Sequence, residues 1–188
     1  MCDVPVFFAT TDGHTRRIAE FLAAAVRLQG LTSEAIDLSL PSAPTLDCGG
    51  ARAIVVAASV HAGTHQRAAA DFVRGHLTAL STRPSLFVSV CLSICSKRPD
   101  DVAAARALAQ VFPDSLGWHP SRVECVAGRL AYTQYGFLKR WLMRQIASRS
   151  GGPTDTSRDY DMTDWQGIRN LADDLAAIAQ PLERVAHA

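Results

Sequence analysis

A run of six consecutive apolar residues, 53–58, constrains the fold of this chain more than any other feature. A strand that is apolar at every position has both of its faces buried. That is the situation of a central strand in a parallel sheet that helices cover on both sides. Such a sheet needs further short apolar strands, each followed by a helix that returns the chain to the start of the next strand.

The rest of the chain supplies this alternation. Apolar runs of strand length predict strands at 4–8, 33–38, 53–58, 86–92 and 123–127. Apolar residues at helical spacing predict helices that include 18–26, 69–80, 99–111 and 168–178. Thr163 and Gln166 form a capping-box pattern before the last helix. We therefore expect one α/β domain over residues 1–188, in which five parallel strands have helices on both faces. An irregular insertion at about 129–161, hereafter the 129–161 segment, precedes the last helix.

Charge, hydropathy and cysteine content exclude several classes of protein. Nineteen basic and eighteen acidic residues give a net charge of +1, so no overall positive field would attract nucleic acid. No stretch approaches the ~20 apolar residues that a membrane-spanning helix needs, and the N-terminus lacks the pattern of a signal peptide. Five scattered cysteines form no C-x-x-C pair and no zinc-ligand spacing. We expect a cytoplasmic protein with reduced thiols and no metal site.

The loop after the first strand carries the clearest chemical signal. Residues 10–15 read Thr-Thr-Asp-Gly-His-Thr and lead directly into a helix. Hydroxyl groups and unpaired backbone N–H groups at a helix N-terminus form an anion site, because the helix dipole also favours negative charge there. The loop lacks both the G-x-G-x-x-G and the G-K-[ST] pattern. It therefore suits a monophosphate held by neutral donors, or else its Thr and Asp residues only cap the helix.

The same loop resembles the phosphate loop of flavodoxins, and further segments narrow the resemblance. Residues 58–63, 89–92 and 127–130 lie at the carboxyl ends of later strands, and Ser150–Thr156 precedes Thr163–Trp165. Together they resemble the flavodoxin-type, menaquinone-dependent protoporphyrinogen IX dehydrogenases of bacteria. The resemblance extends from about Val4 to Ala179. It implies a flavodoxin-like five-stranded sheet and a non-covalently bound FMN.

The resemblance also implies the positions that hold the flavin. The phosphate would be bound by Thr10, Thr11, Asp12, Gly13, His14 and Thr15. The isoalloxazine ring would be flanked by Ser59, Val60, His61, Ala62, Gly63, Ser89, Val90, Cys91 and Leu92. All of these positions lie at or just after the carboxyl ends of strands, at the edge where ligands bind in parallel sheets. The family commonly has a basic and an aromatic residue where this chain has His61 and Ala62. The sequence shows no acid/base pair or catalytic triad, and His61 is the one candidate for a catalytic side chain.

The implied activity is the oxidation of protoporphyrinogen IX to protoporphyrin IX in heme biosynthesis, with menaquinone or another quinone as acceptor. Three alternatives remain open: an electron-carrier flavodoxin, an NAD(P)H:quinone reductase of the same fold, and a flavin-free interaction protein. Carriers of this fold present a strongly acidic face, whereas this chain is nearly neutral. The oligomeric state is open.

The 129–161 segment contains the most uneven charge in the chain. Between Glu124 and Asp155 there are five basic residues and no acidic one. Aromatic and aliphatic residues lie among them. Two interpretations compete: an extra helix packed on the edge of the sheet with its cations extended toward solvent, or a surface that contacts the porphyrinogen and the inner face of an anionic membrane. The second interpretation assigns contact to Arg129, Tyr132, Lys139, Arg140, Trp141 and Arg144.

Overall fold

A parallel sheet forms the centre of the computed structural model, which describes residues 2–40, 48 and 50–179. Its strands lie in the order β2 (Ser33–Asp37), β1 (Val4–Ala9), β3 (Ile54–His61), β5 (Ser85–Val90) and β6 (Arg122–Val126). All four pairings along this path are parallel. The prediction of five parallel strands in a flavodoxin-like order is confirmed.

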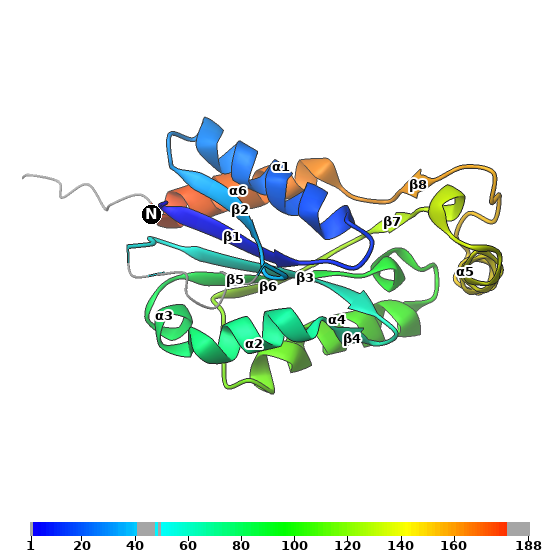
Figure 1. Cartoon of the computed structure of the whole chain (residues 1–188), viewed down its shortest axis with the longest axis horizontal. Coiled ribbons are helices and arrows are strands. Elements are labelled where there is room, and N and C mark those ends of the chain that lie inside the picture. Colours follow the sequence, from blue (N-terminus) through cyan, green and yellow to red (C-terminus); the bar gives the residue numbers. More distant parts are fainter. Residues whose placement is uncertain (1, 41–47, 49, 180–188) are drawn as a thin grey trace, which may run out of the picture.

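Helices cover both faces of the sheet (Figure 1). Helices α1 (His14–Leu28) and α6 (Trp165–Ala179) lie on one face, and α2 (Arg67–Gly75), α3 (Leu77–Thr82) and α4 (Pro99–Asp114) lie on the other. Each face has its own apolar cluster. The alternating residues Val55 and Ala57 of β3 belong to the first cluster, and Ile54 and Val56 belong to the second. The uninterrupted apolar run is therefore explained by burial on both sides.

Two local predictions are wrong in detail. The helix expected over 69–80 is divided, because α2 ends at Gly75 and His76 leaves the helical conformation with φ −123°. The capping box is not formed either. Asp164 Oδ1 accepts the hydrogen bond from the Gly167 backbone N–H at 2.9 Å, while the Thr163 hydroxyl donates to the Ala127 carbonyl oxygen at 2.9 Å. Thr163 thus stabilises the end of β6 instead of the start of α6.

The 129–161 segment is more regular than the sequence predicts. Strands β7 (Arg129–Leu130) and β8 (Tyr160–Asp161) form a two-stranded antiparallel sheet. Between them lie η3 (Tyr132–Gln134) and helix α5 (Phe137–Arg149). The segment has a small apolar cluster of its own, which consists of Leu130, Ala131, Tyr132, Tyr135 and Ala147. Figure 1 shows α5 beyond the end of the central sheet at which β1 terminates.

The glycine-rich motif after α5 attaches this helix to the rest of the molecule. The Gly152 N–H donates to the Ala147 carbonyl oxygen at 2.8 Å, and the Lys97 N–H donates to the Ser150 carbonyl oxygen at 2.9 Å. Gly151 has φ +72°, and a Cβ there would lie 2.7 Å from Lys97 Cδ. Glycine is favoured at this position by the left-handed backbone conformation, and a larger residue would also have to displace the flexible Lys97 side chain.

Candidate cofactor site

A cavity of about 600 Å³ lies where the carboxyl ends of the strands meet α5. The carboxyl ends of β3 and β5 and the segments that follow β1, β3, β5 and β6 form one wall, and Tyr135 with α5 forms the other. Parallel topology explains the first wall, because it brings the ends of successive strands to one edge. The cavity is lined by Thr10, Thr11, Asp12, His14, Thr15, Ser59, Val60, His61, Ala62, Gly63, Val90, Cys91, Leu92, Ser93, Gly128, Arg129, Tyr135, Leu138, Lys139, Leu142, Met143 and Ile146.

The cavity therefore contains most of the residues to which the sequence assigned flavin binding. Gly13 does not line it, but its φ of +78° turns the chain into α1, and its N–H donates to Thr10 Oγ1 at 3.0 Å. Ser89 does not line it either. Its side chain is fully buried and bonded to His65 Nε2 at 2.9 Å. Because successive residues of a strand point to opposite faces, Ser89 faces the α2 and α4 side. Its assignment to the ring is corrected.

The residues assigned to substrate or membrane contact fall into different environments. Arg140 is half-buried and donates to the Tyr135 carbonyl oxygen at 3.0 Å, so it supports the segment and does not line the cavity. Arg129 and Lys139 line the cavity, whereas Trp141 and Arg144 lie on exposed positions of α5. Tyr132 is fully buried, and its hydroxyl donates to the Pro153 carbonyl oxygen at 2.8 Å. It packs the segment from inside and has no surface to offer to a ligand, so that assignment is also corrected.

The N-terminus of α1 is open to an anion. No side chain caps it, and its first turn contains no acidic residue. Thr15 is 1% exposed, and its hydroxyl oxygen has no hydrogen-bond partner among the described residues. A buried hydroxyl without a partner costs about 1–3 kcal/mol, and a bound anion would remove that cost. The sequence prediction of an anion site at residues 10–15 agrees with this geometry.

Gln66, which the sequence did not single out, connects two of the loops. Its side-chain amide nitrogen donates to Thr11 Oγ1 at 3.2 Å and also to Ser59 Oγ. Gln66 Oε1 is buried and has no partner among the described residues. Gln66 follows β4 (Thr64–His65), a short strand that pairs antiparallel with the end of β3 through a turn at Ala62 and Gly63. This turn places His61 at the exposed edge of the cavity.

Helix α5 gives the other wall an apolar surface. Leu138, Leu142, Met143 and Ile146 line the cavity from this helix. At the end nearest the loop of residues 10–15, Lys139 Nζ lies 3.0 and 3.1 Å from the two carboxylate oxygens of Asp12. Among the described residues, Ala147 is the one fully buried residue of α5.

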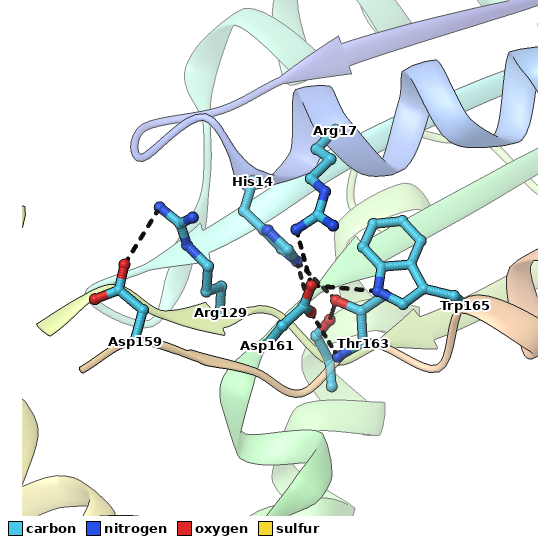
Figure 2. A network of polar contacts seen from close by, with 8 residues as sticks. His14, Arg17, Arg129, Asp159, Asp161, Thr163 and Trp165 are labelled. Carbon is cyan, nitrogen blue, oxygen red and sulfur yellow. Dashed lines mark hydrogen bonds and ion pairs between the residues drawn. The ribbon is translucent and has the colours of Figure 1, made fainter. Parts of the chain in front are cut away.

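A polar network joins the end of the 129–161 segment and the residues that lead into α6 to the start of α1 (Figure 2). His14 Nε2 lies 2.7 Å from Thr163 Oγ1. The single Thr163 hydroxyl hydrogen is directed to Ala127, so Nε2 must carry a hydrogen and donate it to Thr163. Asp161 accepts hydrogen bonds from Arg17 and from the Trp165 indole. Burial lowers the pKa of His14, although the nearby Asp161 carboxylate opposes this effect.

Comparison with known proteins agrees with this architecture. The model of a flavodoxin domain family matches residues 5–157. The protoporphyrinogen IX dehydrogenase (quinone) of Escherichia coli strain K12 is 30% identical over 172 residues, which are 91% of this chain and 93% of that protein. The chain belongs to this flavodoxin-type dehydrogenase family. A member of the same name from Leishmania major is 29% identical over 174 residues, covering 92% of this chain and 74% of that protein.

Solved structures extend the likeness to the fold. An archaeal flavodoxin superposes with a TM-score of 0.55 at 14% identity, over 94% of this chain and 97% of that one. A flavodoxin mutant from Pseudomonas aeruginosa gives a TM-score of 0.57 at 12% identity, over 95% and 99% of the two chains. The flavodoxin domain of the family implies FMN as the cofactor. The residues of the cavity fit that group: an open helix N-terminus and a partnerless Thr15 hydroxyl suit its phosphate, and the apolar α5 wall suits a planar aromatic ring.

Proposed function

We propose that this protein oxidises protoporphyrinogen IX to protoporphyrin IX, with FMN as the bound cofactor and a quinone as the acceptor. The observation that carries this proposal is the shared cavity. Its phosphate loop and its apolar α5 wall face the same space of about 600 Å³. The names of the relatives support the substrate and the acceptor. The reaction removes six electrons and six hydrogens from the porphyrinogen in three two-electron steps, and each step converts one quinone to its quinol.

Bound FMN supplies the two-electron redox chemistry of such a reaction. The chain itself supplies binding and orientation. Thr10, Thr11 and Thr15 would hold the phosphate together with the N–H groups at the start of α1. Ser59, fixed by Gln66, and His61 would lie beside the ring. The apolar side chains of α5 would exclude water above it.

Anaerobic turnover tests this proposal directly. The purified protein is reconstituted with FMN, supplied with protoporphyrinogen and menaquinone, and followed by the fluorescence of protoporphyrin. We expect protoporphyrin to appear in proportion to quinol, at three quinols for each porphyrin. Rapid flavin reduction by NAD(P)H without porphyrinogen turnover would instead identify an NAD(P)H:quinone reductase. Flavin binding without either activity would identify an electron carrier.

We also propose that α5 binds the inner face of the cell membrane. Among the described residues no helix is long and apolar enough to cross a bilayer, so contact would be peripheral. Helix α5 exposes Phe137 at 87%, Leu138 at 75% and Trp141 at 53%. The cations Arg144 and Arg149 are exposed on the same helix. Exposed aromatic and aliphatic side chains beside cations are typical of helices that lie in the interface of anionic membranes.

Liposome co-sedimentation tests the membrane proposal. Phe137→Ser combined with Trp141→Ser removes apolar surface that does not line the cavity. Burial of one large apolar side chain contributes about 1.5–3 kcal/mol, so binding to anionic vesicles should fall by more than tenfold. Leu28→Ser is the matched control, because Leu28 is 84% exposed on α1. Equal sedimentation of the double variant and the wild type would contradict the proposal.

A further inference from the structure

Lys139 reaches across the cavity to the loop of residues 10–15. Its Nζ contacts both carboxylate oxygens of Asp12, at 3.0 and 3.1 Å, although the two residues are 127 positions apart. The ammonium group also lies 4.3 Å from the centroid of the Tyr135 ring. These two contacts hold the ammonium group in place. The 129–161 segment therefore brings a cation to a loop that has none of its own.

Arg129 approaches the same space from β7. It lines the cavity together with Thr10, Thr11 and His14. Figure 2 shows its side chain rising from β7 beside His14. Its nearest acidic partner, Asp159, is 4.0 Å away, and within the described residues its guanidinium donates no hydrogen bond. Arg129 thus has donors available for another acceptor.

An anion at the start of α1 would be stabilised further by such charges. Asp12 lines the cavity within the loop itself, so a phosphate bound there would lie near a carboxylate of like charge. An ammonium or guanidinium group offsets that repulsion more strongly than neutral hydroxyl groups do, because a hydrogen bond from a charged donor is about twice as strong. The partnerless Thr15 hydroxyl marks the position at which an acceptor is missing.

We propose that Lys139 and Arg129 recognise the phosphate group of the flavin, so that the 129–161 segment forms part of the cofactor site. This inference rests on the proposed use of FMN. It assigns to the cofactor two cations that the sequence assigned to substrate or membrane. Contact with the porphyrinogen and the membrane is then left to the exposed remainder of α5.

Comparison of FMN with riboflavin tests this inference, because riboflavin has the same ring and lacks the phosphate. The apoprotein is titrated with each flavin, and binding is followed by quenching of flavin fluorescence. We expect Lys139→Met and Arg129→Met each to weaken FMN binding by about tenfold and to leave riboflavin binding unchanged. Arg149→Met is the control, since it removes one exposed cation from the same helix without reaching the cavity. It should bind both flavins as the wild type does.

Asp12→Asn gives a second measurement that does not depend on the folding of the other variants. Removal of the carboxylate should strengthen FMN binding several-fold and leave riboflavin unaffected. Equal weakening of both flavins in Lys139→Met and Arg129→Met, or no weakening of either, would overturn the phosphate assignment. A wild-type protein that binds neither flavin would overturn the proposed cofactor, and with it the proposed function.

Discussion

The two walls of the cavity are built in different ways. The wall formed by the strand ends stands on the central sheet, where Ala57, Ala58 and Val90 are almost fully buried. The wall formed by α5 has one fully buried residue and five large exposed apolar ones. The first wall is stabilised by the same core that stabilises the fold. The second is held by a few separate contacts, such as Lys139 with Asp12 and Ser150 with Lys97.

This difference separates two tasks. A cofactor that stays bound needs a rigid cradle, and burial of the sheet provides one. Large substrates that exchange need a surface that can move without unfolding the domain, and segments with few buried apolar contacts open at low free energy. The exposed apolar part of α5 meets this need, whereas Lys139 and Arg129 would stay with the proposed cofactor phosphate. The segments Ser150–Thr156 and Thr163–Trp165, which carry the resemblance in the sequence, attach this second wall. Thr163 bonds to His14, and Gly151 packs on Lys97.

Loss of the hydroxyl groups of the phosphate loop should have the largest effect. Thr10, Thr11 and Thr15 replaced together by Val remove three oxygens that line the cavity. Each lost hydrogen bond to a charged group is worth about 1.5–3 kcal/mol, so FMN affinity should fall at least a thousandfold. Fluorescence titration measures it, and membrane binding should stay normal. Unchanged FMN affinity in the triple variant would show that the phosphate binds elsewhere.

The sheet side also contains a partly buried titratable group, His65. Burial lowers the pKa of His65 to about 4, where its ring contacts Phe87 and Phe112. A lowered pKa means that the unfolded chain binds the proton more tightly. The stabilising contribution is complete above pH ~6.5 and is lost as pH falls toward about 4, with a slope of at most ~1.4 kcal/mol per pH unit.

His65→Gln should flatten this part of the stability profile, because Gln keeps a donor for Ser89 and does not titrate. The free energy of unfolding by urea at several pH values between 4 and 7 measures the slope. His119→Gln is the control, since His119 is exposed. If wild type and His65→Gln lost stability in parallel, the partly buried imidazole would not be the group responsible.

Thr15→Val alone should raise the stability of the apoprotein and lower its affinity for FMN. The apoprotein should gain about 1–2 kcal/mol of stability, because a buried hydroxyl without a partner is replaced by a methyl group of similar size. FMN affinity should fall about tenfold. Thermal unfolding without and with FMN measures both effects. A loss of stability in the apoprotein would mean that the hydroxyl has a partner within the fold.

The sequence predicted the first wall better than the second, for a physical reason. Apolar runs and helical spacing are local patterns, and parallel topology then places the strand ends together. The contact of Lys139 with Asp12 and the pairing of β7 with β8 join residues that are far apart in the sequence. No local sequence pattern predicts such contacts. Ser89 was misassigned although the alternation along β5 could have separated it from Val90. Burial of Tyr132 depends on a cluster that forms only when the whole segment folds.

The smallest effect is expected from His61, which remains the proposed catalytic candidate. It lies exposed on the turn between β3 and β4, at the edge of the rigid wall. Because its ring is exposed, His61→Ala should change the free energy of unfolding by less than about 0.5 kcal/mol. FMN affinity should stay close to that of the wild type, because the phosphate contacts lie in another loop.

Turnover or the flavin reduction potential should change if the imidazole lies beside the ring. Spectroelectrochemical titration and anaerobic turnover measure these quantities, with Arg67→Ala as an exposed control from the neighbouring helix. Identical potentials and rates in His61→Ala and the control would make the β3–β4 turn a structural edge of the cavity, and the flavin ring would then be oriented by Ser59 and the backbone alone.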